Sequence, residues 1–282
     1  MEKELIVSIL YVVATPIGNL EDITERAKRV LSEVDLIAAE DTRHTAIVLN
    51  HLNIKTPLTS YHDHNESSAS HSLIEQIKSG KEIALVSDAG TPLIADPGYR
   101  LVKLAREEGV KVVPIPGVSA VTAALSVAGL PTDKFTYHGF LPAKSKALQD
   151  FLKELENEPG TLIFYESPHR LVKTVAMFEK VFGSDRILVV ARELTKRFEQ
   201  VSYGTIGEAR ERIEAGEIVV KGEFVLLLQG QLKVDSEWDE RKLLAELLTD
   251  LSVSRAAELA SRLTGRSKNV LYKIAISMKE DS

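Results

Sequence analysis

The chain has 282 residues, a length that predicts about two domains, and a hydrophobic content of 44% that can fill a sizeable core. The formal net charge of -6 argues against a generic nucleic-acid coat protein, so any contact with RNA must use a local basic patch. The absence of cysteine excludes disulfides, thiolate nucleophiles and cysteine-bound zinc. No run of about 18 apolar residues predicts a membrane span, and we expect a cytoplasmic protein.

Apolar runs alternate with helical patterns through the first half of the chain. Strands are predicted at residues 5–13, 36–39, 83–86 and 110–115, and helices at residues 23–31, 45–52, 70–77 and 99–107. The apolar start of the chain is short and lacks a small-residue cleavage site, so it is interpreted as a strand and not as a signal peptide. Strands that are apolar throughout are typical of a sheet with helices on both faces. The pattern therefore predicts an α/β fold with a largely parallel sheet.

A second cycle of strands and helices follows. Strands are predicted at residues 135–139, 161–165, 187–191 and 218–228, and helices at residues 146–155, 170–182 and 206–215. A Pro-Gly loop at Gly117 leads into an Ala/Val-rich helix over residues 118–128, and the boundary between two lobes is placed there. We therefore expect an N-terminal α/β lobe over residues 1–117 and a C-terminal α/β lobe over residues 118–232. A ligand cleft is expected between the two lobes.

The tail, residues 233–282, has a different charge pattern. Residues 233–250 carry six acids against three bases, whereas residues 254–279 carry six bases against one acid. Two apolar helical faces are predicted on either side of Gly265, one formed by Ala256, Leu259, Ala260 and Leu263 and the other by Val270, Leu271, Ile274 and Ala275. A helix, a glycine turn and a basic helix are the outline of a helix-turn-helix. The alternative is an amphipathic cap that docks on the second lobe.

Three loops of small residues each follow a predicted strand of the first lobe. The first, residues 14–22, is not the GxGxxG fingerprint of a dinucleotide site. The second, residues 87–98, holds two Asp, two Gly and two Pro, which favours a rigid binding loop over a plain turn. The third, residues 116–120, contains Ser119, which could cap a helix or bind a ligand carboxylate. Because all three loops end strands, they predict one composite ligand site at the carboxyl ends of those strands.

Polar residues at other strand ends are weaker candidates. Glu40 and Asp41 end the second strand, where an acid could bind a ribose hydroxyl or cap a helix. The histidines at positions 62, 64 and 71 lie in a Ser/Asn-rich stretch, and no metal site is predicted there.

Two polar segments of the second lobe, residues 166–170 and 191–197, are interpreted as parts of the substrate site, with surface ion pairs as the alternative. Lys196 and Arg197 could hold phosphate while Phe198 stacks a base.

Seven motifs occur in order along the chain, and together they resemble those of a known family. They are YVVATPIGNL (residues 11–20), AEDTR (39–43), the loop at 87–98, PGVS (116–119), GFLP (139–142), ESPHR (166–170) and RELTK (192–196). They resemble the small-subunit ribosomal RNA methyltransferases of the tetrapyrrole-methylase-like superfamily over residues 10–230. The basic tail resembles the C-terminal extension of that family. One departure is Ala14, where the family often has glycine.

The resemblance implies a two-lobed enzyme that binds S-adenosylmethionine in its cleft. It also implies 2′-O-methylation of a cytidine in the decoding region of 16S rRNA, on the assembled small ribosomal subunit, by a homodimer. The cofactor contacts implied by the motifs are Pro16, Gly90, Thr91, Ile94, Ser119, Ala120 and Ser167.

A ribose hydroxyl is a poor nucleophile, so a general base or a nearby cation would assist methyl transfer. Glu166, Glu193 and Lys196 are the predicted catalytic residues, because each follows a second-lobe strand that faces the expected cleft.

Two other functions stay open from the sequence. The first is methylation of a small tetrapyrrole, against which the basic tail argues because a macrocycle needs no phosphate anchor. The second is a nucleotide-sensing regulator that binds DNA through the tail, which predicts affinity for duplex DNA without methyl transfer.

Overall fold

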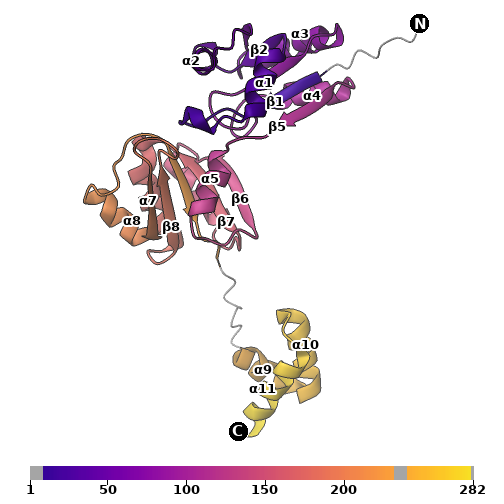
Figure 1. Ribbon diagram of the computed structural model, residues 1–282. Coiled ribbons are helices and arrows are strands. Elements are labelled where there is room, and N and C mark those ends of the chain that lie inside the picture. The colour runs from indigo at the N-terminus through magenta and orange to yellow at the C-terminus, as the bar shows by residue number, and fades with distance from the viewer. Residues whose placement is uncertain (1–8, 232–239, 281–282) are drawn as a thin grey trace. The chain divides into compact units, whose positions relative to one another are not determined.

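The computed structural model describes residues 9–231 and 240–280, and the chain divides into two compact units, Met1–Gly230 and Gln231–Ser282 (Figure 1). The predicted strand at residues 5–13 and the predicted acidic segment at 233–250 each begin outside the described residues. Among the described helices, none is long and apolar enough to cross a membrane.

The first lobe is built on a parallel sheet with the strand order β3-β2-β4-β1-β5. Its strands are β1 (Ile9–Val13), β2 (Leu36–Ala39), β3 (Leu58–Ser60), β4 (Ile83–Val86) and β5 (Lys111–Ile115). Its helices are η1 (Leu20–Asp22), α1 (Glu25–Glu33), α2 (Thr42–His51), α3 (Glu66–Lys78) and α4 (Tyr99–Glu107). Helices α1 and α2 pack against one face of the sheet, and α3 and α4 against the other. This lobe confirms the predicted parallel sheet with two covered faces.

Because all strands of the first sheet run parallel, the loops that follow them lie at one edge of the sheet. β1 lies between β4 and β5, where Tyr11 pairs with Ala84 on one side and Val113 on the other. The backbone N–H of Thr15 donates to the carbonyl oxygen of Gly90 at 2.8 Å, and the N–H of Gly90 donates back at 2.9 Å. The loops that follow β1 and β4 are therefore fixed to each other by their backbones.

The second lobe is built on a mixed sheet with the strand order β6-β7-β10-β8-β9. Its strands are β6 (Phe135–Phe140), β7 (Thr161–Glu166), β8 (Ile187–Arg192), β9 (Gln200–Thr205) and β10 (Phe224–Leu228). Only β6 and β7 pair in parallel, whereas β10 runs antiparallel to β7 and β8, and β8 runs antiparallel to β9. The largely parallel arrangement expected from the repeated pattern does not extend here. The connection from β8 to β9 is too short for the crossover that a parallel pair needs.

Four helices cover the second sheet, namely α5 (Ala120–Val127), α6 (Ser145–Glu154), α7 (Pro168–Phe182) and α8 (Ile206–Glu214). α6, α7 and α8 bury one face around Phe164 and Phe178. α5 covers the other face, and Ile17 from the first lobe packs into the same cluster. The two lobes therefore share apolar contacts beside the loop that follows β1.

The second unit contains α9 (Glu240–Asp250), α10 (Val253–Thr264) and α11 (Lys268–Glu280). Gly265 ends α10 in the left-handed conformation, at φ 73°, which a glycine adopts without steric cost. The buried residues are mostly small, and they are Leu244, Ala256, Ala257, Ala260, Leu271 and Ala275. The predicted apolar faces were too wide, because Leu263 is 58% exposed and Val270 is 44% exposed. A helix, a glycine turn and a second helix are confirmed.

Candidate active site

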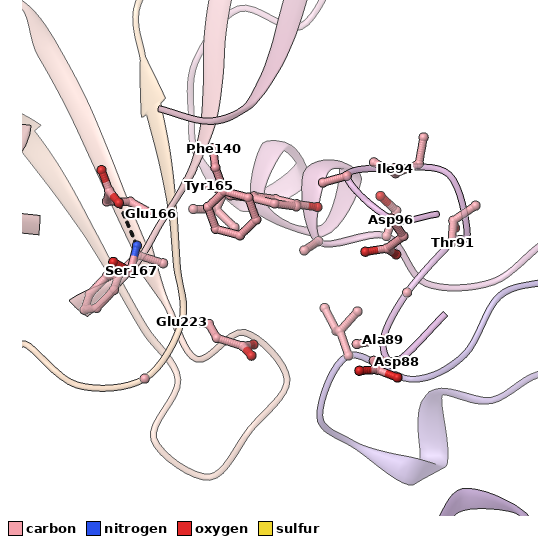
Figure 2. A pocket seen from close by; sticks show the side chains of 18 of the residues that line it. Asp88, Ala89, Thr91, Ile94, Asp96, Phe140, Tyr165, Glu166, Ser167 and Glu223 are labelled. Atoms are coloured by element: carbon pink, nitrogen blue, oxygen red, sulfur yellow. Dashed lines mark hydrogen bonds between the residues drawn. The ribbon is translucent and has the colours of Figure 1, made fainter. Parts of the chain in front are cut away.

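A cavity of about 460 Å³ is lined by loops of both lobes (Figure 2). This volume lies in the range of small-ligand sites. The first lobe contributes Ile17, Glu40, Asp88, Ala89, Gly90, Thr91, Ile94, Ala95 and Asp96. The second lobe contributes Ser119, Ala120, Phe140, Tyr165, Glu166, Ser167, Pro168, Gly222, Glu223, Phe224 and Val225.

The loop that follows β4 forms much of the first-lobe wall and has an unusual backbone path. Gly90, Leu93 and Ala95 have φ angles of 80°, 73° and 70°. Positive φ is costly for residues with a side chain, and such strain collects at ligand sites. The hydroxyl of Thr91 donates to the carbonyl oxygen of Val118 at 3.0 Å and so ties this loop to the start of α5. The dense Gly/Pro/Asp pattern of this loop therefore shapes a cavity wall, as the sequence predicted.

Three carboxylates, those of Glu40, Asp88 and Asp96, line the first-lobe side of the cavity. Burial, reinforced by repulsion from Asp96 and Asp88, raises the pKa of Glu40 to about 7. Burial likewise raises the pKa of Asp96 to about 6, with Asp88 as a repulsive neighbour. Like charges held close together in a partly buried site favour a bound cation.

Asp41, beside this group, has a structural role. Its carboxylate accepts a hydrogen bond from the N–H of Arg43 at 2.9 Å and caps α2. Its own N–H donates to the carboxylate of Asp88 at 2.9 Å, which ties the loop after β2 to the loop after β4. Of the two acids that end β2, only Glu40 lines the cavity.

Two helices begin at the cavity wall. Ser119 and Ser167 occupy the N-cap positions of α5 and α7, and neither side chain makes the capping hydrogen bond. The structure therefore does not use Ser119 as a side-chain cap. Backbone N–H groups at the start of a helix bind anions such as carboxylates.

Glu166 lines the cavity but is only 2% exposed. Its carboxylate accepts hydrogen bonds from the N–H of Ser167 at 2.8 Å and from the hydroxyl of Thr174 at 2.5 Å. The guanidinium of Arg170 lies 3.5 Å away. A buried carboxylate with three such partners holds the start of α7 in place.

Glu193 and Lys196 do not line the cavity, but they support a residue that does. The ammonium of Lys196 lies 3.0 Å from the Glu193 carboxylate and 2.9 Å from the carboxylate of Glu223, which is on the cavity rim. Burial alone would lower the pKa of Lys196, but the hydrogen bonds to Glu223 and Glu193 outweigh it and raise that pKa. Glu193 and Thr195 also have positive φ angles, of 49° and 67°.

The structure places six of the seven predicted cofactor residues on the cavity wall, and these are Gly90, Thr91, Ile94, Ser119, Ala120 and Ser167. Pro16 is buried next to Ile17, which does line the cavity.

Sequence reasoning placed Asp96 in a predicted binding loop without giving it a role, and it missed Tyr165 and Glu223 as site residues. Gly222, a glycine inside the predicted strand at 218–228, was a signal for the last of these, because such a glycine often marks an irregularity. The strand β10 begins only at Phe224.

The fold and the cavity define a class of methyltransferase. The family model described as Tetrapyrrole (Corrin/Porphyrin) Methylases matches residues 9–210, and the model described as RsmI C-terminal HTH domain matches residues 235–279. Ribosomal RNA small subunit methyltransferase I of Escherichia coli O157:H7 is 50% identical over 272 residues, which are 96% of this chain and 95% of that protein. The protein of the same name from Haemophilus influenzae is 47% identical, over 96% of this chain and 98% of its own. The chain therefore belongs to the ribosomal RNA small subunit methyltransferase I family.

Solved structures agree on the fold. Diphthine synthase superposes with a TM-score of 0.60 at 16% identity, over 79% of this chain and 90% of its own. Uroporphyrin-III-C-methyltransferase from Thermus thermophilus superposes with a TM-score of 0.57 at 19% identity, over 82% of this chain and 98% of its own. The predicted fold of two α/β lobes with a helical extension is confirmed.

Proposed function

We propose that the protein transfers a methyl group from S-adenosylmethionine to the ribose 2′-hydroxyl of a cytidine in the decoding region of 16S rRNA. The observation that carries this proposal is the cavity formed by loops of both lobes, in a chain that shares half its residues with ribosomal RNA small subunit methyltransferase I.

The walls of the cavity fit the cofactor in charge and in shape. S-adenosylmethionine carries an ammonium and a sulfonium cation, which the carboxylates of Glu40, Asp88 and Asp96 complement. Its carboxylate suits the helix start at Ser119 and the hydroxyl of Ser167, which makes no capping hydrogen bond. Its adenine needs an apolar surface, and the cavity offers Ile17, Ile94, Tyr165 and Val225.

The cofactor supplies an already activated methyl group, so the protein contributes mainly position and orientation. A proton must still leave the ribose hydroxyl. We assign its acceptance to Glu40 or Asp96, whose carboxylates line the cavity and whose pKa values burial raises in the protein without ligand.

The side chains first considered for catalysis receive supporting roles in this proposal. Glu166 positions Ser167 at the start of α7. Lys196, which pairs with Glu193, fixes the carboxylate of Glu223 at the rim of the cavity.

The second unit supplies affinity for the phosphate backbone. Its bases Arg255, Arg262 and Lys273 are exposed on α10 and α11. Truncation after Gly230 should weaken the binding of small-subunit RNA about tenfold or more and reduce its dependence on salt, because fewer counterions are released. Cofactor affinity should be retained. Equal RNA affinity with and without the second unit, measured by filter binding over a salt series, would remove this role.

The partner in this proposal is the assembled small ribosomal subunit, the acting form is a homodimer, and the location is the cytoplasm. Sedimentation equilibrium of the purified chain tests the dimer, since a single species at monomer mass would contradict it.

The function is tested by offering labelled S-adenosylmethionine with three acceptors in parallel: unmodified small subunits, free 16S rRNA and uroporphyrinogen. Label on the small subunits is expected. Label on the tetrapyrrole alone would replace the proposed substrate. Affinity for duplex DNA with no label on any acceptor would favour a regulator.

A further inference from the structure

An irregularity in β6 determines where the side chain of Phe140 lies. β6 pairs with β7 in parallel, with Tyr137 opposite Ile163 and Phe140 opposite Tyr165. Three steps along β6 therefore match two steps along β7, so β6 holds one extra residue. Gly139 accommodates this bulge with a φ of 64°.

The bulge moves Phe140 to the other face of the sheet. Residues of a regular strand alternate between faces, so Phe140 would share a face with His138. His138 stacks on Phe164, in the core beneath α6 and α7, with ring centroids 5.4 Å apart. Phe140 instead lies on the face of Tyr137 and Tyr165, which is the face that borders the cavity. Bulges that redirect a side chain are frequent beside active sites.

The ring of Phe140 packs against Tyr165 on one side and is open to solvent on the other. It meets Tyr165 edge to face, with centroids 5.6 Å apart and planes at 68° (Figure 2). Tyr165 meets Tyr137 in the same way, with centroids 5.1 Å apart. Phe140 is nevertheless 61% exposed, although it lines the cavity. An aromatic ring in this setting presents a stacking surface at the cavity mouth.

The segment after Phe140 is held firmly. The guanidinium of Arg170 donates to the carbonyl oxygens of Leu141 at 2.6 Å and Pro142 at 3.0 Å. Leu141 itself is buried in the core beneath α6 and α7. With the bulge before it and these bonds after it, Phe140 is held in its exposed position before any ligand arrives, which limits the entropy lost on binding.

We propose that Phe140 is the platform on which the base of the target nucleotide stacks. This inference rests on the proposed function. A ribose inside the cavity requires its nucleotide to leave the RNA stack, and bases that leave a stack bind protein by stacking on aromatic rings. The three carboxylates of the first-lobe wall repel phosphate but tolerate a neutral nucleoside, so the ribose and its base enter while the flanking phosphates stay outside.

Exposure and position distinguish this role of Phe140 from two other assignments: binding of the cofactor's adenine by Phe140, and stacking of the target base on Phe198. The adenine of the cofactor needs an enclosed surface, which Ile17 and Val225, both buried, provide better than an exposed ring. Phe198, the aromatic residue that the sequence favoured for stacking, is 63% exposed but does not line the cavity.

The test compares variants of the full chain in single-turnover methylation of small subunits and in cofactor titration. Phe140→Ala should lower kcat/KM for the subunit about 10- to 100-fold, with the cofactor Kd changed less than twofold. Phe140→Trp should retain activity, and Phe140→Leu should resemble Phe140→Ala because it keeps apolar area without a π face. Phe135→Ala is the matched control, since Phe135 is a 44%-exposed ring on the same strand outside the cavity.

Three outcomes would overturn the inference: full activity of Phe140→Ala, full activity of Phe140→Leu, or an equal loss of cofactor affinity. Wild-type protein on the same subunits distinguishes this failure from failure of the proposed function. A wild type that methylates beside a fully active Phe140→Ala removes only the stacking role, whereas a wild type that leaves the subunits unlabelled removes both.

Discussion

The two lobes contribute to the cavity in different ways. The first lobe uses a parallel sheet whose strand ends meet at one edge, and it lines the cavity with backbone turns and carboxylates. The second lobe uses a mixed sheet, and it contributes aromatic rings, two helix starts and a rim supported by ion pairs. The first lobe therefore depends on the path of its backbone, and the second depends more on particular side chains.

The largest effect should follow from adding a side chain to the backbone of the first lobe. Gly90 has a φ of 80°, and a Cβ there would lie 3.3 Å from Cγ2 of Ile17. Gly90→Val should weaken binding of S-adenosylmethionine on the order of 100-fold, because the branched side chain both strains the loop and fills the cavity. Isothermal titration measures the change.

Gly109→Val is the control for backbone strain. Gly109 has a similar φ of 71°, and a Cβ there would meet none of the described atoms within 4 Å. The affinity of the Gly109→Val variant for S-adenosylmethionine should stay at the wild-type level. If the two valine variants bound the cofactor equally well, the loop after β4 would not form the binding wall.

The carboxylates of the first lobe should make cofactor binding depend on pH. A cation is attracted once Glu40 and Asp96 have lost their protons, so affinity should rise about tenfold as pH increases through about 6 and about 7 and then level off. Glu40→Gln should flatten the upper part of this profile. Glu75 is an exposed acid of α3 outside the cavity, so the control variant Glu75→Gln should leave the pH profile of cofactor affinity unchanged. An affinity that falls as pH rises would contradict the proposed cation site.

The same raised pKa predicts the pH dependence of stability without ligand. Folded Glu40 holds its proton up to about pH 7, whereas the unfolded chain releases it near its ordinary value of 4.5. The folded state therefore binds more protons in this window, and stability should fall as pH rises through it. At pH 8, Glu40→Gln should stabilise the free protein by about 1 kcal/mol, after allowance for solvent screening. Denaturant unfolding at pH 5 and pH 8 measures the difference.

The smallest effect should come from the ion pairs of the second lobe. Lys196→Met removes the charge between Glu193 and Glu223 but keeps most of the apolar side chain. That side chain packs closely on Gly18, where a Cβ would overlap it. Stability should fall by about 1 kcal/mol, and KM should rise more than kcat falls. Lys146→Met, which breaks an exposed pair with Asp150, is the control. Equal effects of the two substitutions would mean that the rim needs no support from Lys196.

The sequence predicted the first lobe better than the second, for physical reasons. The strands β2 and β4 and helix α4 have the predicted bounds, because buried apolar runs and a strong helical period leave few alternatives. One edge strand of each lobe was missed: β3, with the sequence LTS, and β9, with the sequence QVSYGT, are partly exposed and carry little apolar signal. The composite site was predictable from loops that end parallel strands. Tyr165 and Glu223 were not, since their approach to the first-lobe loops depends on how the lobes pack.

The central claim is tested most directly by the position of the transferred methyl group. Small subunits lacking the modification are incubated with labelled S-adenosylmethionine. One part of their 16S rRNA is digested to nucleosides, another part is cut into fragments of known sequence, and both are separated by chromatography. The account predicts that the label elutes as 2′-O-methylcytidine and maps to the decoding region, and that Gly90→Val strongly lowers its yield at a cofactor concentration near the wild-type Kd. Label on a base, on another nucleoside or on no RNA at all would contradict it.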